Sequence, residues 1–196
     1  MEKTLLIGNG LNRTLQFSIS WSELLCDIAK EHNVEYIPDL PMPLEFERII
    51  NTILKKSDVP NSQIYSDVKA RIARKVKDVK LPDDAIHREL ATVKSNAIIT
   101  TNYDYLLEYA YNRGFNYKGK TNLKYLWEAT SVQQGIKFYH MHGMADNPAS
   151  ICLGYEHYMG IVENLRSMLN AKVQNRQDEM KIKRILKGED APTDYW

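Results

Sequence analysis

The sequence reads Ala97-Ile98-Ile99-Thr100-Thr101-Asn102-Tyr103-Asp104 where an apolar run gives way to a polar cluster. The run is short and rich in β-branched residues, so it predicts a buried strand from Asn96 to Thr100. Open α/β sheets hold their ligands beyond the carboxyl ends of the strands. The polar side chains after Thr100 therefore indicate a ligand site. The alternative is that Thr101 or Asn102 only caps a helix beginning at Tyr103.

Two other apolar runs also end in a polar turn. Residues 4–7 lead into Gly8-Asn9-Gly10-Leu11-Asn12, and residues 136–141 lead into His142-Gly143. Both runs are predicted to be strands, because turn-forming residues stop them. If the three strands are parallel in one sheet, their polar ends converge on one cleft.

Apolar spacing predicts helices elsewhere in the chain, over 20–32, 44–55, 64–79, from 81 onward, 102–113 and about 155–186. The 64–79 segment has few apolar residues and many basic ones, which is typical of a solvated outer helix. In the next helix, Ile86, Leu90 and Val93 are predicted to face inward. The predicted fold class is α/β: one domain over 1–196, with a Rossmann-like parallel sheet flanked by helices and a long helical insertion at about 35–95.

The composition excludes several functions. With 26 Lys and Arg residues against 25 Asp and Glu residues, the net charge of +1 predicts no direct binding of nucleic acid or of an anionic membrane. The two cysteines, Cys26 and Cys152, form no zinc-binding pattern, so no metal is expected. Neither a signal peptide nor an apolar run that could span a bilayer is visible, and a cytoplasmic location is the default expectation.

The turn from Gly8 to Asn12 is similar to the start of a dinucleotide-binding turn, in which glycines let the backbone approach a pyrophosphate. Its third glycine is missing, because Arg13 stands there. The acidic residue of the usual fingerprint would fall near Glu31, inside a helical pattern, which disfavours an ordinary nicotinamide dehydrogenase. A plain strand-to-loop turn without a ligand is the other interpretation of this motif.

The histidines are open to several interpretations. On a strand, His140 and His142 would share a face, and a metal site is conceivable, but no third ligand stands at a diagnostic spacing. His87 and His157 lie in helical patterns and are more simply surface or packing residues. A single His-Gly pair such as His142-Gly143 is most often a turn. Its position at the third predicted strand end favours a functional role.

Taken in this order, the three clusters resemble the SIR2 superfamily, and specifically the SIR2-like NAD-binding domains of prokaryotic defence proteins. Gly8 to Asn12 matches the family's Gly-x-Gly turn, Thr100 to Asp104 its Thr-x-Asn-x-Asp motif, and His142-Gly143 its His-Gly pair. The resemblance spans residues 4 to about 158. Classical sirtuin deacylases carry four zinc-binding cysteines, and the two cysteines of this sequence argue against that type.

The resemblance implies that the chain uses NAD as a substrate and cleaves its bond between nicotinamide and ribose. It implies that Gly8 and Gly10 approach the phosphates, that Asn102 orients the ribose or the attacking water, and that Asp104 lies near the nicotinamide amide. His142 is implied as general base, a task that suits an imidazole. Neighbouring motif residues are expected to complete the NAD site: Asn9, Asn12, Thr101 and Gly143. His140 departs from the family pattern and is expected to lie behind the residues that contact NAD.

The functional prediction is an NAD hydrolase that yields nicotinamide and ADP-ribose as an effector in antiviral defence. The alternatives are a non-catalytic module that binds NAD or an ADP-ribose derivative, and an NAD-dependent deacylase or ADP-ribosyltransferase. Family members continue into further strands that contact the adenosine, so the resemblance predicts an incomplete sheet and a chain truncated at its C-terminus. A homo-oligomer or an attached C-terminal domain would cover the open sheet edge.

Overall fold

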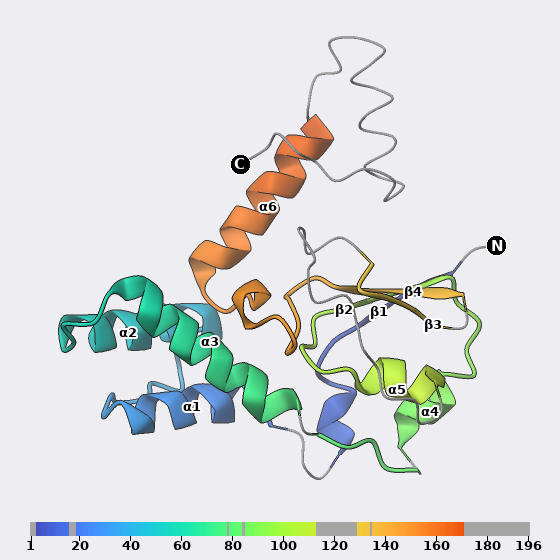
Figure 1. Ribbon diagram of the computed structural model, residues 1–196, viewed down its shortest axis with the longest axis horizontal. Coiled ribbons are helices and arrows are strands. Elements are labelled where there is room, and N and C mark those ends of the chain that lie inside the picture. The colour runs from blue at the N-terminus through green and yellow to red at the C-terminus, as the bar shows by residue number, and fades with distance from the viewer. Residues whose placement is uncertain are drawn as a thin grey trace. The chain divides into compact units, whose positions relative to one another are not determined.

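The computed structural model describes residues 3–15, 19–77, 79–83, 85–112, 129–133 and 135–170 (Figure 1). The chain divides into two compact units, residues 1–154 and 155–196. The predicted site lies wholly in the first unit. In the second, the described part is a single helix, α6 (Tyr155–Asn170).

A four-stranded sheet forms the centre of the first unit. Its strands are β1 (Thr4–Ile7), β2 (Ala97–Thr100), β3 (Ser131–Gln133) and β4 (Ile136–His140), and they lie in the order β1-β2-β4-β3. The pairs β1–β2 and β2–β4 are parallel, whereas β3 is antiparallel to β4. The predicted parallel sheet of three strands, flanked by helices, is therefore confirmed as an incomplete Rossmann-like arrangement.

The carboxyl ends of the three parallel strands lie in one row. Ile7 is in register with Thr100, and Thr100 is in register with His140. Backbone hydrogen bonds continue just past the strands, from Thr101 N–H to the Ile7 carbonyl and from Met141 N–H to the Thr100 carbonyl. The three polar motifs consequently leave the sheet side by side, as the sequence predicts.

One face of the sheet packs against two short helices, α4 (Ile86–Leu90) and α5 (Leu106–Asn112), which lie together below the strands in Figure 1. Side chains alternate along a strand, so one set from β1, β2 and β4 faces these helices. Ile98, Phe138, Leu107 and Tyr111 form the buried centre of this layer. This packing fixes α5 under the ends of β2 and β4.

Three longer helices form a second core beside the sheet: α1 (Trp21–Glu31), α2 (Met42–Lys55) and α3 (Asn61–Lys77). Ser20 caps α1 through a capping box with Glu23. The segment predicted as a solvated outer helix is α3, which has an exposed face and a buried face. Its apolar residues are few, but they recur every four positions and are buried: Ile64, Val68 and Ile72.

Several finer predictions differ from the structure. The helix predicted from residue 81 is only the short α4, where Leu90 packs inward but Ile86 and Val93 are exposed. In α6, Val162 is exposed although its spacing predicts burial. The predicted continuation of α6 over 171–186 lies outside the described residues. Within the described part of 35–95 the structure has helices and no strand, in agreement with the predicted helical insertion.

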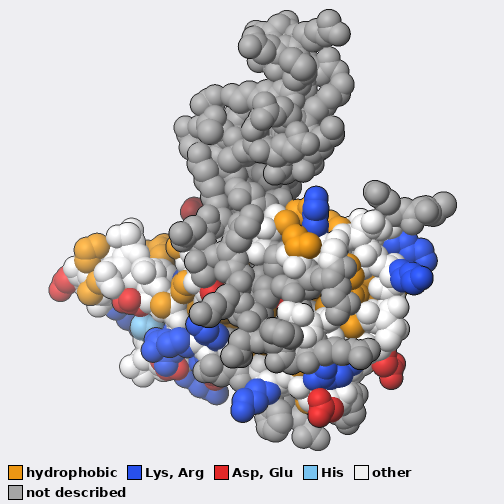
Figure 2. Space-filling model, turned by 45° about the vertical axis from the view of Figure 1, so that its right-hand side comes forward, with side chains coloured by type: hydrophobic (Ala, Val, Ile, Leu, Met, Phe, Trp, Pro, Cys, Tyr) orange, Lys and Arg blue, Asp and Glu red, His pale blue; other side chains and the backbone are white. Residues whose placement is uncertain are grey.

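The surface carries charges of both signs. On the face shown in Figure 2, described basic and acidic side chains lie in several separate places, with hydrophobic side chains between them. This distribution fits a chain whose net charge is +1. No helix among the described residues is long and apolar enough to cross a lipid bilayer.

Candidate functional site

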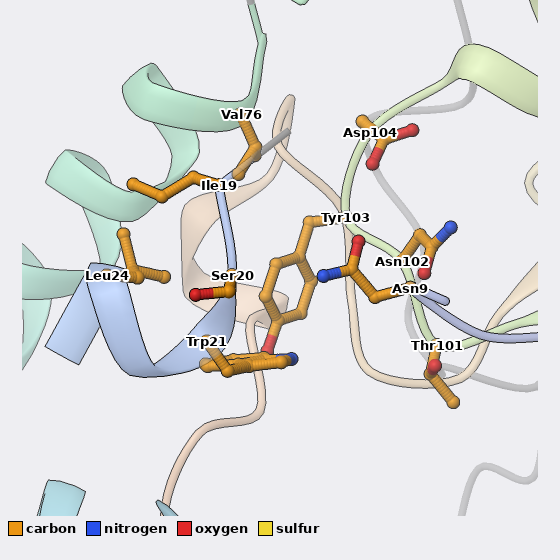
Figure 3. Close-up of a pocket in the computed structure, with 10 residues that line it drawn as sticks. All are labelled: Asn9, Ile19, Ser20, Trp21, Leu24, Val76, Thr101, Asn102, Tyr103 and Asp104. Carbon is orange, nitrogen blue, oxygen red and sulfur yellow. The ribbon is translucent and has the colours of Figure 1, made fainter. Parts of the chain in front are cut away.

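A pocket of about 30 Å³ opens where the strand ends face the start of α1 (Figure 3). Its polar wall comes from the turns after β1 and β2, with Asn9, Thr101, Asn102 and Asp104. The opposite wall is mostly apolar and comes from the segment that enters α1 and from the end of α3. It consists of Ile19, Ser20, Trp21, Leu24 and Val76. Tyr103 lies between the two walls in Figure 3, and its ring meets that of Trp21 edge-on at 5.3 Å.

The second wall of this pocket comes mainly from the segment that enters α1, with one residue from α3. In many open α/β sheets, the ligand crevice lies where the strand order reverses. The described parallel strands follow chain order, β1-β2-β4, and the swapped pair β4-β3 lies at the edge away from β1, so no reversal among the described strands adjoins the pocket. Here the second wall of the pocket comes from α1 and α3 and not from a neighbouring strand end.

Asn102 is the most unusual side chain in the pocket. It is only 4% exposed, and neither its Oδ1 nor its Nδ2 has a hydrogen-bond partner. Its backbone, by contrast, is held on both sides: its N–H donates to Thr100 Oγ1, and its carbonyl accepts from His140. Buried polar groups are nearly always paired, and unpaired ones are often functional. The Asn102 amide is therefore ready to bind a ligand that supplies both a donor and an acceptor.

Asp104 is held by a chain of hydrogen bonds that reaches across the sequence. Its Oδ2 accepts from Asn12 Nδ2 at 2.6 Å, and Asn12 Oδ1 lies 2.9 Å from His87 Nε2. Because Asn12 donates to the carboxylate, its oxygen is the acceptor and His87 Nε2 must carry hydrogen. Asp104 Oδ1 accepts from the N–H of Leu106, the first residue of α5.

These contacts change two predictions. The helix α5 begins at Leu106, and the side chain that accepts a hydrogen bond from its first N–H is that of Asp104. The alternative in which Thr101 or Asn102 caps a helix beginning at Tyr103 is therefore wrong. His87 is fully buried and is joined to the pocket through Asn12, whereas the sequence suggests only a surface or packing residue. Its spacing in a helical pattern carries no sign of this contact, which joins residues 75 positions apart.

Burial is the main cause of the pKa shifts in the hydrogen-bonded series Asp104–Asn12–His87. It raises the pKa of Asp104 above its ordinary value, although the hydrogen bonds from Leu106 and Asn12 and the neighbouring His140 act in the opposite direction. Burial also lowers the pKa of His87, which keeps that imidazole neutral at pH 7. The carboxyl group of Asp104 is thus held by neutral donors, the Asn12 amide and the Leu106 N–H.

The first turn is unobstructed at both glycines. A Cβ on Gly8 would make only an ordinary contact with Thr101 Oγ1, and a Cβ on Gly10 would meet nothing. Neither glycine has a positive φ. Packing and backbone strain therefore do not explain these glycines, and the turn leaves room for a ligand to approach the backbone.

His142 and Gly143 lie just beyond the last strand. Because β4 ends at His140, the argument that His140 and His142 share a strand face does not apply. His142 is half-buried, and burial lowers the pKa of its imidazole. It is not among the described residues that line the pocket. Gly143 has a structural reason to be glycine: its φ is +90°, and a Cβ would collide with the carbonyl of Ser150.

Behind Asn102 lies a second buried group. His140 Nδ1 is 2.7 Å from the Asn102 carbonyl oxygen, and its Nε2 is 2.8 Å from Glu108 Oε1. Both side chains are completely buried. The prediction that His140 lies behind the residues that line the site agrees with this position.

Comparison with known proteins adds the family. Residues 96–181 match the family model of the SIR2-like domain. This match supports a SIR2-like domain in that part of the chain. The matched segment begins at β2 and includes the Asn102 motif and His142-Gly143, and an NAD-related function follows from it. No curated protein matches the sequence significantly.

The residues present suit part of an NAD molecule. The orphaned amide of Asn102, the unobstructed turn at Gly8 and Gly10, and the aromatic wall offer polar, anionic and planar groups their usual partners. Among the described residues, no group of three or more His, Cys, Asp or Glu side chains is placed to hold a metal ion.

Proposed function

We propose that this chain hydrolyses NAD to nicotinamide and ADP-ribose, and that it acts as an effector in antiviral defence by depleting NAD. The SIR2-like domain supports a function that involves NAD. The observation that carries the specific proposal is the buried and unpaired amide of Asn102 at the end of β2.

The chemistry assigns a role to each polar group. The bond between the ribose carbon and the nicotinamide nitrogen breaks, and its electron pair leaves with the neutral ring. The oxygen of a water attacks that carbon. Asn102 holds the ribose hydroxyl or the water, which places the reacting atoms in line. His142, kept neutral by burial, takes the proton of the water as general base.

The remaining residues bind the substrate. Gly8 and Gly10 let backbone N–H groups approach the phosphates, with Asn9 beside them. Asp104, held in place by Asn12, accepts from the carboxamide of nicotinamide. The apolar wall around Trp21 keeps bulk water away from the positive charge that develops on the ribose.

The test is a time course of the full chain with NAD, in which nicotinamide is measured by chromatography. Asn102→Ala and His142→Ala should each abolish nicotinamide release while the unfolding temperature stays close to that of the wild type. Two exposed residues of the same types, Asn51 and His32, provide matched controls, and their replacement by Ala should leave the rate unchanged. Undiminished NAD cleavage by either site variant would refute the assignment.

One observation favours a second candidate, a module that binds NAD or an ADP-ribose derivative without cleaving it. His142, the proposed base, does not line the described pocket. Calorimetry with NAD followed by analysis of the products separates the two functions. Heat of binding with intact NAD recovered afterwards supports the binding module, whereas release of nicotinamide supports the hydrolase.

A further inference from the structure

Glu108 and His140 form a completely buried pair that the proposed reaction does not use. His140 is the last residue of β4, Glu108 lies on α5, and both have no exposed surface. Burying a carboxyl group and an imidazole together is costly unless they share a proton or a charge. Their contact at 2.8 Å indicates that they do.

The hydrogen bonds show how many protons the pair holds. A backbone carbonyl can only accept, so His140 Nδ1 carries a hydrogen that it donates to the Asn102 carbonyl at 2.7 Å. The contact between Nε2 and Glu108 Oε1 then requires a second proton, on the imidazole or on the carboxyl group. Either way, the pair carries one proton more than a neutral histidine beside a carboxylate.

The same pair fixes the backbone of Asn102. Its N–H is bound to Thr100 Oγ1 and its carbonyl to His140, while its side-chain amide has no partner within the protein. The direction of that amide is therefore set by the backbone that carries it. We propose that Glu108 and His140 are positioning residues, which hold the Asn102 carbonyl so that its amide points correctly at the substrate.

The charges around His140 keep the pair protonated. Burial opposes a charge on the imidazole, but the charge and hydrogen bond of Glu108, the Asn102 carbonyl and the charge of Asp104 together outweigh it. The pKa of His140 is consequently raised above its ordinary value. The other neighbour on this side is the ring of Tyr105, 5.5 Å away and edge-on. The raised pKa favours the protonated pair, in which the hydrogen bond to the Asn102 carbonyl is present.

Two substitutions of His140 separate this role from simple packing. The amide nitrogen of Asn falls near the place of Nδ1, and that of Gln falls near the place of Nε2. His140→Asn thus keeps a donor for the Asn102 carbonyl, whereas His140→Gln keeps the contact with residue 108 and loses that donor. Both are made together with Glu108→Gln, so that no unpaired carboxylate is buried and the two double variants have the same charge.

The kinetic expectation rests on the proposed function. The Gln variant should lose about 10²-fold in kcat for NAD cleavage, because a misplaced catalytic group costs about that much, with little change in KM. The Asn variant should recover most of this loss. Tyr139→Phe, on the opposite face of β4, is the matched control and should behave as the wild type. Equal kcat values for the Asn and Gln variants would overturn the proposal.

A second measurement does not depend on catalysis. The side-chain NH₂ signal of Asn102 in ¹⁵N-labelled protein should shift in the Gln variant and stay near the wild-type position in the Asn variant. In the wild type it should also move in step with the loss of the His140 proton as the pH rises, a test that needs no variant to fold. An Asn102 signal that stays at the same position in the Gln variant and as the pH rises refutes the positioning role. If the wild type releases no nicotinamide, the proposed hydrolase activity fails and these signals alone decide the positioning role.

Discussion

Replacing Asn102 by Leu should make the protein more stable and inactive at the same time. Leu has the same branching and the same number of side-chain heavy atoms as Asn, but no polar atoms. In the wild type, residue Asn102 is only 4% exposed, and both polar atoms of its amide are unpaired. Burying an unpaired amide costs about 1–3 kcal/mol. The substitution removes this cost and leaves the backbone bonds to Thr100 and His140 unchanged.

We take the lower end of that range, about 1 kcal/mol, as the expected gain in the free energy of unfolding. For a chain of this length this raises the unfolding temperature by roughly 2–4 °C. The assay is thermal and urea unfolding without NAD, together with nicotinamide release. A Leu variant that is less stable than the wild type by about 1 kcal/mol would refute the reasoning, since the amide would then be bound within the protein.

The neighbouring Thr100 provides the matched control. It is fully buried, and its Oγ1 accepts from the Asn102 N–H. Thr100→Val is a similar exchange of a polar for an apolar atom, but it leaves a buried N–H without a partner. It should therefore destabilise the protein by about 1–3 kcal/mol. Opposite signs for two such similar substitutions would distinguish a functional polar group from a structural one.

Three further predictions concern the other parts of the site. Gly143→Ala should lower the free energy of unfolding by more than about 1 kcal/mol, because of the positive φ and the collision with Ser150, whereas Gly10→Ala should raise it slightly and weaken NAD binding in calorimetry. His87→Leu should cost about 1–3 kcal/mol in urea unfolding, because it leaves Asn12 Oδ1 buried without a donor, and His87→Gln should recover part of this loss. The rate of NAD cleavage should fall in acid as His142 gains a proton below its lowered pKa, and in alkali as the pair of His140 loses its proton above its raised pKa; a rate that falls on neither side would contradict both assignments.

His140 and His142 should also make the free energy of unfolding depend on pH in opposite directions. His140 binds its proton more tightly in the folded state, so its contribution is complete below the ordinary pKa of about 6.5 and is lost as the pH rises through the raised value. Burial makes His142 resist protonation, so its contribution is complete above about 6.5 and is lost as the pH falls through the lowered value. Urea unfolding of His142→Ala against the wild type across this range isolates the acid side.

The sequence predicts the parallel strands well because local signals bound each one. The apolar run of β1 stops at Gly8, and the predicted bounds of β1 are those of the structure, while those of β2 and β4 differ by one residue. The edge strand β3 (Ser131–Gln133) was not predicted. It has a single apolar residue, Val132, and exists through its antiparallel pairing with β4. Such a strand depends on a tertiary contact that no local pattern carries.

In the site, too, the sequence predicts what local motifs carry and does not predict what depends on tertiary contacts. The motif residues Asn9, Thr101, Asn102 and Asp104 are brought together in the pocket as expected, because they follow strands that end in register. The residues that hold them are not visible in the motifs. His87 reaches Asn12 from a helix 75 positions away, and Glu108 reaches His140 across 32 positions. A helical pattern predicts burial at those positions, but not the partner that each side chain meets.

The glycines show why residue type alone could not separate structure from function. Gly8, Gly10 and Gly143 stand in motifs of equal weight, and the resemblance assigns all three to NAD. In the structure, Gly143 is required by its φ of +90° and by the carbonyl of Ser150, whereas Gly8 and Gly10 meet no such constraint. A glycine that the fold does not require is unfavourable, because it adds entropy to the unfolded chain. Its presence at the first turn would be accounted for by the proposed function, in which a ligand's phosphates come close to the backbone there.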